Sequence, residues 1–154
     1  MTKKIYLAYG SNMNKQQMQH RCPDAEIVGV AELPNYQLQF RRVLTIVSCP
    51  GCSVPVAVWL ISTKDEANLD VYEGYPSFYR KEQLFIPFSD GSAHSGMIYL
   101  MNGGCIAPPS VHYFNIVEQG YRDFDLNISP LKEALQCSLV EKKSSLQCSF
   151  QYGV

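Results

Sequence analysis

Short apolar runs broken by turn residues dominate the first 61 positions of the chain, and this pattern predicts strands. The last of these runs, 54–61, is the most apolar in the protein. Gly29 marks a bend in the second strand, and the Pro, Gly and Ser content predicts a loop over 48–53. The expected strands cover residues 4–9, 25–33, 35–41 with an extension over 43–47, and 54–61.

Helix signals follow the first strand and recur in the second half of the chain. Asn14 is the expected N-cap of a first helix that ends near Cys22, with Gln17 as its capping-box partner. Thr63 and Glu66 give a second capping-box signal. Two further helices are expected, one from Ser110 with the apolar stripe Tyr113, Ile116, Val117, Gly120, Tyr121 and Phe124, and one from Ser129 with the core side Leu131, Leu135 and Leu139.

The second half also contains a hairpin signal. Asp90 and Gly91 lie between two apolar runs, 78–88 and 95–101, and an Asp-Gly pair in that position favours a tight turn. The helical pattern is lost from Lys143 onward. About six strands and three to four helices with mixed connections predict one α+β core. We therefore expect a single domain over 1–142 and a C-terminal tail over 143–154.

Composition and charge exclude several classes of partner. The formal net charge is −1, and the basic residues form no patch longer than a pair, so we expect no nucleic-acid partner. No apolar run approaches the ~18 residues of a membrane span, so no membrane partner is expected. The apolar stretch near the N-terminus is shorter than the ~7–15 residues of a signal-peptide core, which favours a cytoplasmic location.

The six cysteines are widely scattered, and we expect free thiols. Cys49 and Cys52 have the spacing of half a zinc site. A second pair at a matching distance is absent from the sequence, so neither a metal nor another cofactor is expected.

The stretch from Tyr9 to Asn12 ends the first strand and leads directly into the first helix. Gly and small polar residues allow a sharp turn there and leave backbone N–H groups without partners. Together with the positive end of the helix, these groups suit a carboxylate or a phosphate. A plain strand-to-helix turn with no ligand is the alternative. Because neither common phosphate-loop glycine pattern is present, a nucleotide is not expected.

Glu73 is the candidate acid or base. It falls on the same helical face as Leu69 and Tyr72, in the last turn before Gly74 ends the helix. Burial and the negative end of a helix both disfavour a carboxylate, so both raise its pKa, which is how a general base is tuned toward neutrality. The alternative is a structural glutamate paired with Arg80 or Lys81.

Three segments in register give the chain a family resemblance that runs from about residue 5 to residue 140. It resembles the γ-glutamylcyclotransferase family in its bacterial, AIG2-like form. The segments that carry the resemblance are Ala8-Tyr9-Gly10-Ser11-Asn12-Met13, then Leu69-Asp70-Val71-Tyr72-Glu73-Gly74-Tyr75-Pro76, and Ala107-Pro108-Pro109-Ser110 followed by Tyr113 and Gly120.

The resemblance implies a small mixed β-barrel with flanking helices. It also implies release of 5-oxoproline from a γ-glutamyl amide, by attack of the substrate's α-amine on its own γ-carbonyl. Carried over position by position, Glu73 matches the family's catalytic glutamate and Tyr113 its substrate-binding tyrosine. The substrate loop of the family matches Tyr6, Leu7, Ala8, Tyr9, Gly10, Ser11 and Asn12.

Two functions are therefore weighed from the sequence. The first is an enzyme in which Glu73 moves the proton, while the loop amides hold either the substrate carboxylate or the oxyanion. The second is a non-catalytic module that binds a small anion or a γ-glutamyl ligand on the same fold. Four aromatic residues could line a pocket for a leaving amine, although aromatic residues at such spacings more often belong to the hydrophobic core, and these are Tyr36, Tyr75, Phe78 and Tyr79.

Overall fold

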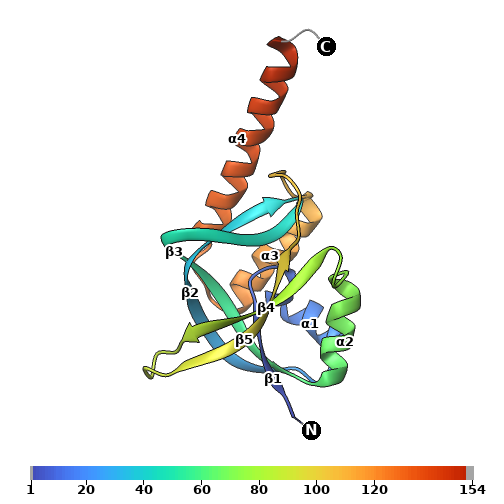
Figure 1. Ribbon diagram of the computed structural model, residues 1–154, viewed down its shortest axis with the longest axis vertical. Coiled ribbons are helices and arrows are strands. Elements are labelled where there is room, and N and C mark those ends of the chain that lie inside the picture. Colours follow the sequence, from blue (N-terminus) through green and yellow to red (C-terminus); the bar gives the residue numbers. More distant parts are fainter. Residues whose placement is uncertain (1, 152–154) are drawn as a thin grey trace.

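A mixed β-sheet forms the centre of the domain (Figure 1). The computed structural model describes residues 2–151, and the side chains of residues 2–144. Within those residues the sheet has five strands in the order β2-β3-β1-β5-β4. β1 pairs in parallel with β5, and the other neighbours are antiparallel. The strands are β1 (Lys4–Ala8), β2 (Glu26–Arg41), β3 (Val43–Ile61), β4 (Tyr79–Pro87) and β5 (Ala93–Met101).

Four α-helices and one 3-10 turn complete the described part of the chain. Figure 1 shows α1 and α2 on one flank of the sheet and α4 extending away from it. The first half of α4 packs on the body, against β2. The elements are η1 (Ser11–Met13), α1 (Lys15–Arg21), α2 (Thr63–Tyr72), α3 (Val111–Asp123) and α4 (Ser129–Gln151).

The α+β class is confirmed, but the expected barrel is not. In the described residues the edge strands β2 and β4 each have one hydrogen-bonded neighbour, so the sheet is open. The strand count is five instead of about six, because the expected strands 25–33 and 35–41 are one long strand, β2. The turn residues that predicted strand ends in this region lie instead at irregularities within strands. The pairing of β2 with β3 changes register at Pro34 and Tyr36, where residues 49–52 lie opposite Asn35.

The expected loop over 48–53 is this irregular part of β3. Asn35 and Gly51 adopt positive φ, and the Asn35 side chain accepts a hydrogen bond of 3.1 Å from the Gly51 amide. The chain folds back enough to bring the Cα atoms of Cys49 and Cys52 to 5.5 Å, and the two form a disulfide. The expectation of free thiols is therefore wrong for this pair.

The N-caps show how closely local sequence sets the helix starts. Asn14 and Ser110 cap α1 and α3 as expected. In α2 the N-cap is Ser62, one residue before the expected Thr63, and Asp65 completes the capping box. The observed pair Ser62–Asp65 and the expected pair Thr63–Glu66 both have the three-residue spacing of a capping box.

The core lies on both faces of β1 and of the apolar end of β3. Leu7, Val56 and Ile98 are fully buried there. Leu131 at the start of α4 is fully buried, whereas Leu139 is 38% exposed. The helix continues through the expected boundary at 142/143 as far as Gln151, and the rest of the expected tail, 152–154, lies outside the described residues. None of the helices in the described residues is long and apolar enough to cross a membrane.

The packing of α3 against η1 positions the loop that follows β1. Gly120 is buried, and a Cβ atom at this position would lie 2.8 Å from the backbone of Met13 and Asn14. Because both contacts are with backbone, the loop would have to move to admit any side chain. The glycine in the stripe of α3 is thus what allows the helix to approach the loop.

We predict that Gly120→Ala lowers the free energy of unfolding by about 1–3 kcal/mol, although alanine is the better helix former, because the added methyl overpacks this contact. Urea denaturation followed by circular dichroism measures the change. Gly103→Ala is the control, since a Cβ at that position meets open space. Equal midpoints for the two variants would contradict the prediction.

Candidate functional site

A cavity of about 210 Å³ opens beside the C-terminal end of β1. Its walls come from the loop after β1, the start of β3, the end of α2, strands β4 and β5, and α3. Glu73 is the one acid among the lining residues, and no lysine or arginine lines the cavity in the described part of the chain. The lining residues are Tyr6, Tyr9, Gly10, Ser11, Asn12, Val43, Leu44, Tyr72, Glu73, Phe78, Tyr79, Tyr99 and Tyr113.

Most of the site residues expected from the sequence meet in this cavity. Tyr6, Tyr9, Gly10, Ser11, Asn12, Glu73 and Tyr113 all line it. Leu7 and Ala8 do not, because both are buried in the core, where Leu7 approaches Gly96. Of the four aromatic residues that the sequence left open, Phe78 and Tyr79 line the cavity, and Tyr36 and Tyr75 do not.

Glu73 is half-buried at the C-terminal end of α2 and faces the loop after β1. Gly74 follows with a φ of 64°, which ends the helix as expected. One Glu73 carboxylate oxygen accepts a hydrogen bond of 3.0 Å from the Asn12 side-chain amide. Burial raises the pKa of Glu73 to about 7, while the nearby Arg21 charge and the Asn12 hydrogen bond act in the opposite direction. The carboxylate therefore titrates close to neutral pH.

The alternative role for Glu73, pairing with Arg80 or Lys81, is wrong. Arg80 donates to Glu82 at 2.9 Å, and Lys81 binds Glu66 and Asp70 at 2.9 Å each. Neither cation contacts Glu73. Its carboxylate lines the cavity and has no ion-pair partner among the side chains that the structure describes.

The loop between β1 and α1 contributes Gly10, Ser11 and Asn12 to the lining of the same cavity. Its two internal hydrogen bonds run from the amide of Met13 to Gly10 and from the amide of Asn14 to Ser11. Within residues 2–151, the amides of Gly10, Ser11 and Asn12 donate no hydrogen bond. Three consecutive amides of this kind can bind an oxyanion or a carboxylate.

Two tyrosine hydroxyls add further donors to the cavity. Tyr113 Oη accepts a bond of 3.1 Å from the Leu44 amide, and Tyr6 Oη accepts one of 2.8 Å from the Asn12 side chain. Because each oxygen is used as an acceptor, each phenolic proton remains available to a ligand. Burial raises the pKa of both tyrosines above the ordinary value, so both are neutral donors near pH 7.

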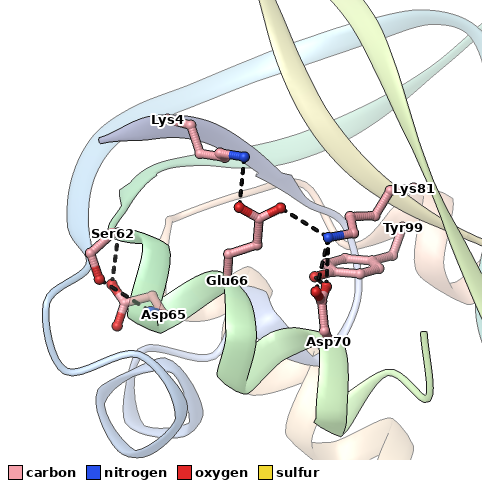
Figure 2. A network of polar contacts seen from close by, with 7 residues as sticks. All are labelled: Lys4, Ser62, Asp65, Glu66, Asp70, Lys81 and Tyr99. Atoms are coloured by element: carbon pink, nitrogen blue, oxygen red, sulfur yellow. Dashed lines mark hydrogen bonds and ion pairs between the residues drawn. The ribbon is translucent and has the colours of Figure 1, made fainter. Parts of the chain in front are cut away.

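A polar network fixes α2, and with it Glu73, against the sheet (Figure 2). Glu66 binds Lys4 of β1 at 2.6 Å and Lys81 of β4 at 2.9 Å. One turn later, Asp70 binds Lys81 and accepts a bond of 2.6 Å from the hydroxyl of Tyr99 in β5. Burial raises the pKa of Glu66, but the bonds from Lys4 and Lys81 outweigh it, so the pKa lies below its ordinary value. Three strands therefore hold one helix face.

The sequence did not identify several residues of the site. Tyr99, Val43 and Leu44 line the cavity without a motif that marks them, and Tyr72 lies in a family segment that did not mark it as a site residue. Burial raises the pKa of Glu73, and the charge of Arg21, in the last turn of α1, acts in the opposite direction. Basic residues are common in the last turn of a helix because they interact favourably with the helix dipole, so Arg21 did not stand out in the sequence. No group of three potential metal-ligating side chains is found in the residues that the structure describes.

Comparison with known proteins identifies the family of this chain. Residues 6–122 match the model of the family described as gamma-glutamyl cyclotransferase, AIG2-like. The chain belongs to this family. Its members include enzymes named gamma-glutamylcyclotransferase, and the family forms 5-oxoproline.

Several relatives match most of this γ-glutamylcyclotransferase-family chain at modest identity. It is 29% identical to the gamma-glutamylcyclotransferase of Homo sapiens over 132 residues, 77% of this chain and 70% of that protein. The protein of the same name from Bos taurus is 26% identical over 142 residues, 84% of this chain and 76% of that protein. A solved gamma-glutamyl cyclotransferase superposes with a TM-score of 0.78 at 26% identity, covering 88% of this chain and 87% of that one.

The raised pKa of Glu73 gives a stability prediction. The folded state holds the Glu73 proton more tightly than the unfolded chain, so its stabilising effect is fully present below the ordinary value of 4.5 and is lost as the pH rises through about 7. Glu73→Gln removes this loss. We expect the variant to exceed the native protein in stability at pH 8 by at most about 3 kcal/mol, at ~1.36 kcal/mol per pKa unit.

Thermal unfolding between pH 4 and pH 8 measures this difference. The gain of Glu73→Gln over the native protein should shrink as the pH falls toward 4. Glu82→Gln, at a side chain that is 39% exposed and does not line the cavity, is the control and should show no such trend. A gain that does not vary with pH would mean that Glu73 titrates normally.

Proposed function

We propose that this protein is a γ-glutamyl cyclotransferase that releases 5-oxoproline from a γ-glutamyl amide, with Glu73 as its acid and base. The observation that carries the proposal is the single carboxylate, with a pKa of about 7, in a cavity lined by three consecutive residues whose backbone amides donate no hydrogen bond within the described chain. Family membership supports the same reaction class. The proposed substrate is a small molecule, and the cytoplasmic location stays a prediction from the sequence.

The geometry supports two separate sets of donors in the cavity, each for a different group of the substrate. The amides of Gly10, Ser11 and Asn12 suit one anionic group of the substrate, and the hydroxyls of Tyr6 and Tyr113 suit a second oxygen. A γ-glutamyl amide has two such oxygen sites, its α-carboxylate and the γ-carbonyl oxygen that becomes an oxyanion. The enzyme has mainly to hold the folded conformer, because the attack is intramolecular.

The proposed proton path balances without a co-reactant. Glu73 takes a proton from the substrate's α-ammonium, and the free amine attacks the γ-carbonyl carbon to close a five-membered ring. In the tetrahedral intermediate, Glu73 gives this proton to the leaving nitrogen and then takes the second proton from the ring nitrogen, which the attack has left as a cationic NH2 group. The intermediate collapses, the bond to the leaving nitrogen breaks, and Glu73 passes the second proton to the departing amine. Overall the α-nitrogen loses two protons and the leaving amine gains two, so the amine departs as an ammonium ion.

Glu73 must be ionised to accept the first proton, and this sets the expected pH dependence. We predict that kcat/KM rises with pH through an acidic limb near pH 7, and that Glu73→Gln lowers kcat by about 10²–10⁴-fold and removes the limb. The assay measures 5-oxoproline by mass spectrometry with γ-glutamyl dipeptides, γ-glutamyl amines and glutathione as substrates. Full turnover by Glu73→Gln would exclude Glu73 from the chemistry. Saturable binding without product from any substrate would favour the binding module.

The hydroxyl of Tyr113 gives a second prediction. Tyr113→Phe removes a neutral donor from the cavity, and loss of one such donor to an oxyanion costs about 10²-fold in kcat. Tyr36→Phe is the matched control, because Tyr36 does not line the cavity. A rise in KM with unchanged kcat would instead assign Tyr113 to the ground-state carboxylate. Equal kinetics for both variants and the native protein would remove Tyr113 from the site.

A further inference from the structure

Arg21 joins three separate elements next to the cavity. Its guanidinium lies 3.5 Å from the ring centroid of Tyr72 on α2. One nitrogen donates to the Asn12 side-chain oxygen and, at 3.2 Å, to the Ser11 hydroxyl. The other donates to Gln17, one turn earlier on α1, at 2.6 Å. This side chain is therefore held by α1, α2 and the loop together, although it does not line the cavity.

The contact with Arg21 fixes which way the Asn12 amide points. A guanidinium has only donors, so the atom that faces it must be the Asn12 oxygen. The Asn12 nitrogen then points the opposite way, and its two protons go to Glu73 at 3.0 Å and to Tyr6 at 2.8 Å. If the amide were reversed, its oxygen would lie against the Glu73 carboxylate.

We propose that Arg21 is a positioning residue for the reaction: by orienting the Asn12 amide, it holds Glu73 and Tyr6 in their working geometry. The proposal rests on the proposed function for its catalytic consequence. The orientation itself is independent of any turnover.

Arg21 is also the charged group that acts on Glu73 from the described part of the chain. The other titratable groups that face Glu73 are phenols, whose pKa values are all raised by burial, so they stay neutral near pH 7. They come from β1, the loop, β4, β5 and α3 and are Tyr6, Tyr9, Tyr79, Tyr99 and Tyr113. Removing the Arg21 charge should therefore raise the pKa of Glu73 further.

The test compares Arg21→Met with Arg21→Lys. We expect Arg21→Met to lower kcat on the order of 10- to 100-fold with little change in KM, because a misplaced catalytic group slows the chemistry more than it weakens binding. The acidic limb of the pH profile should move to higher pH. Arg21→Lys keeps the charge and a donor, so it should return the limb toward the native position and recover part of kcat.

A second measurement does not depend on activity. Proteins labelled with ¹³C at the glutamate carboxyl are titrated by NMR, and the Glu73 signal is identified by its absence in Glu73→Gln. We expect the Glu73 pKa to be higher in Arg21→Met than in the native protein and to return in Arg21→Lys. Arg122→Met, on the exposed face of α3, is the matched control and should leave both kcat and the Glu73 titration unchanged.

The outcomes separate the two proposals. If the native protein forms no 5-oxoproline but the Glu73 titration shifts as expected, the proposed function fails and the role of Arg21 in orienting the amide stands. An unshifted titration in a folded Arg21→Met overturns the role of Arg21, whatever the activity. Equal loss of kcat in the Met and Lys variants, with an unmoved acidic limb, also overturns it and indicates a purely structural contact.

Discussion

The hydrogen bond between the Asn12 amide and the Glu73 carboxylate is the contact on which the candidate site depends. It joins the loop after the first strand to the end of α2, two segments 61 residues apart in the sequence. A carboxylate in this place is costly, because no lysine or arginine of the described residues lines the cavity and the nearby Arg21 charge offsets only part of the effect of burial. The result is a carboxyl group whose pKa is raised to about 7.

The rest of the domain serves to keep these two segments in place. On one side, Glu66 and Asp70 fasten α2 to β1, β4 and β5. On the other, Gly120 lets α3 pack closely against the loop. Lys81 is paired with Glu66 and Asp70 and so helps to hold the helix, and it is therefore not available to Glu73. As a result, Glu73 is the acid that lines the cavity in the described part of the chain, whereas Glu66 and Asp70 are paired with lysines outside it.

The sequence predicts local features of this protein better than long-range ones. The caps at Asn14 and Ser110, the helix end at Gly74 and the hairpin at Asp90 follow from neighbouring residues, and the structure has them all. The open sheet and the continuous β2 depend on pairing with β3, which can absorb a proline and a bulge. The position of Glu73 on a partly apolar helix face predicted its burial. No pattern in the sequence around Arg21 predicts its contacts with Tyr72 and Asn12.

The place of β1 in the sheet has a consequence for how the protein matures. This strand comes first in the chain, yet it lies between β3 and β5 and completes its pairing only when residue 97 is present. The residues around the cavity span positions 6 to 113, so its walls cannot be assembled from any shorter stretch. Contacts of such high sequence separation form late in folding because loop closure must precede them. A nascent or truncated chain that ends before β5 therefore lacks part of the cavity wall, and a ligand can meet the complete cavity only in the folded domain.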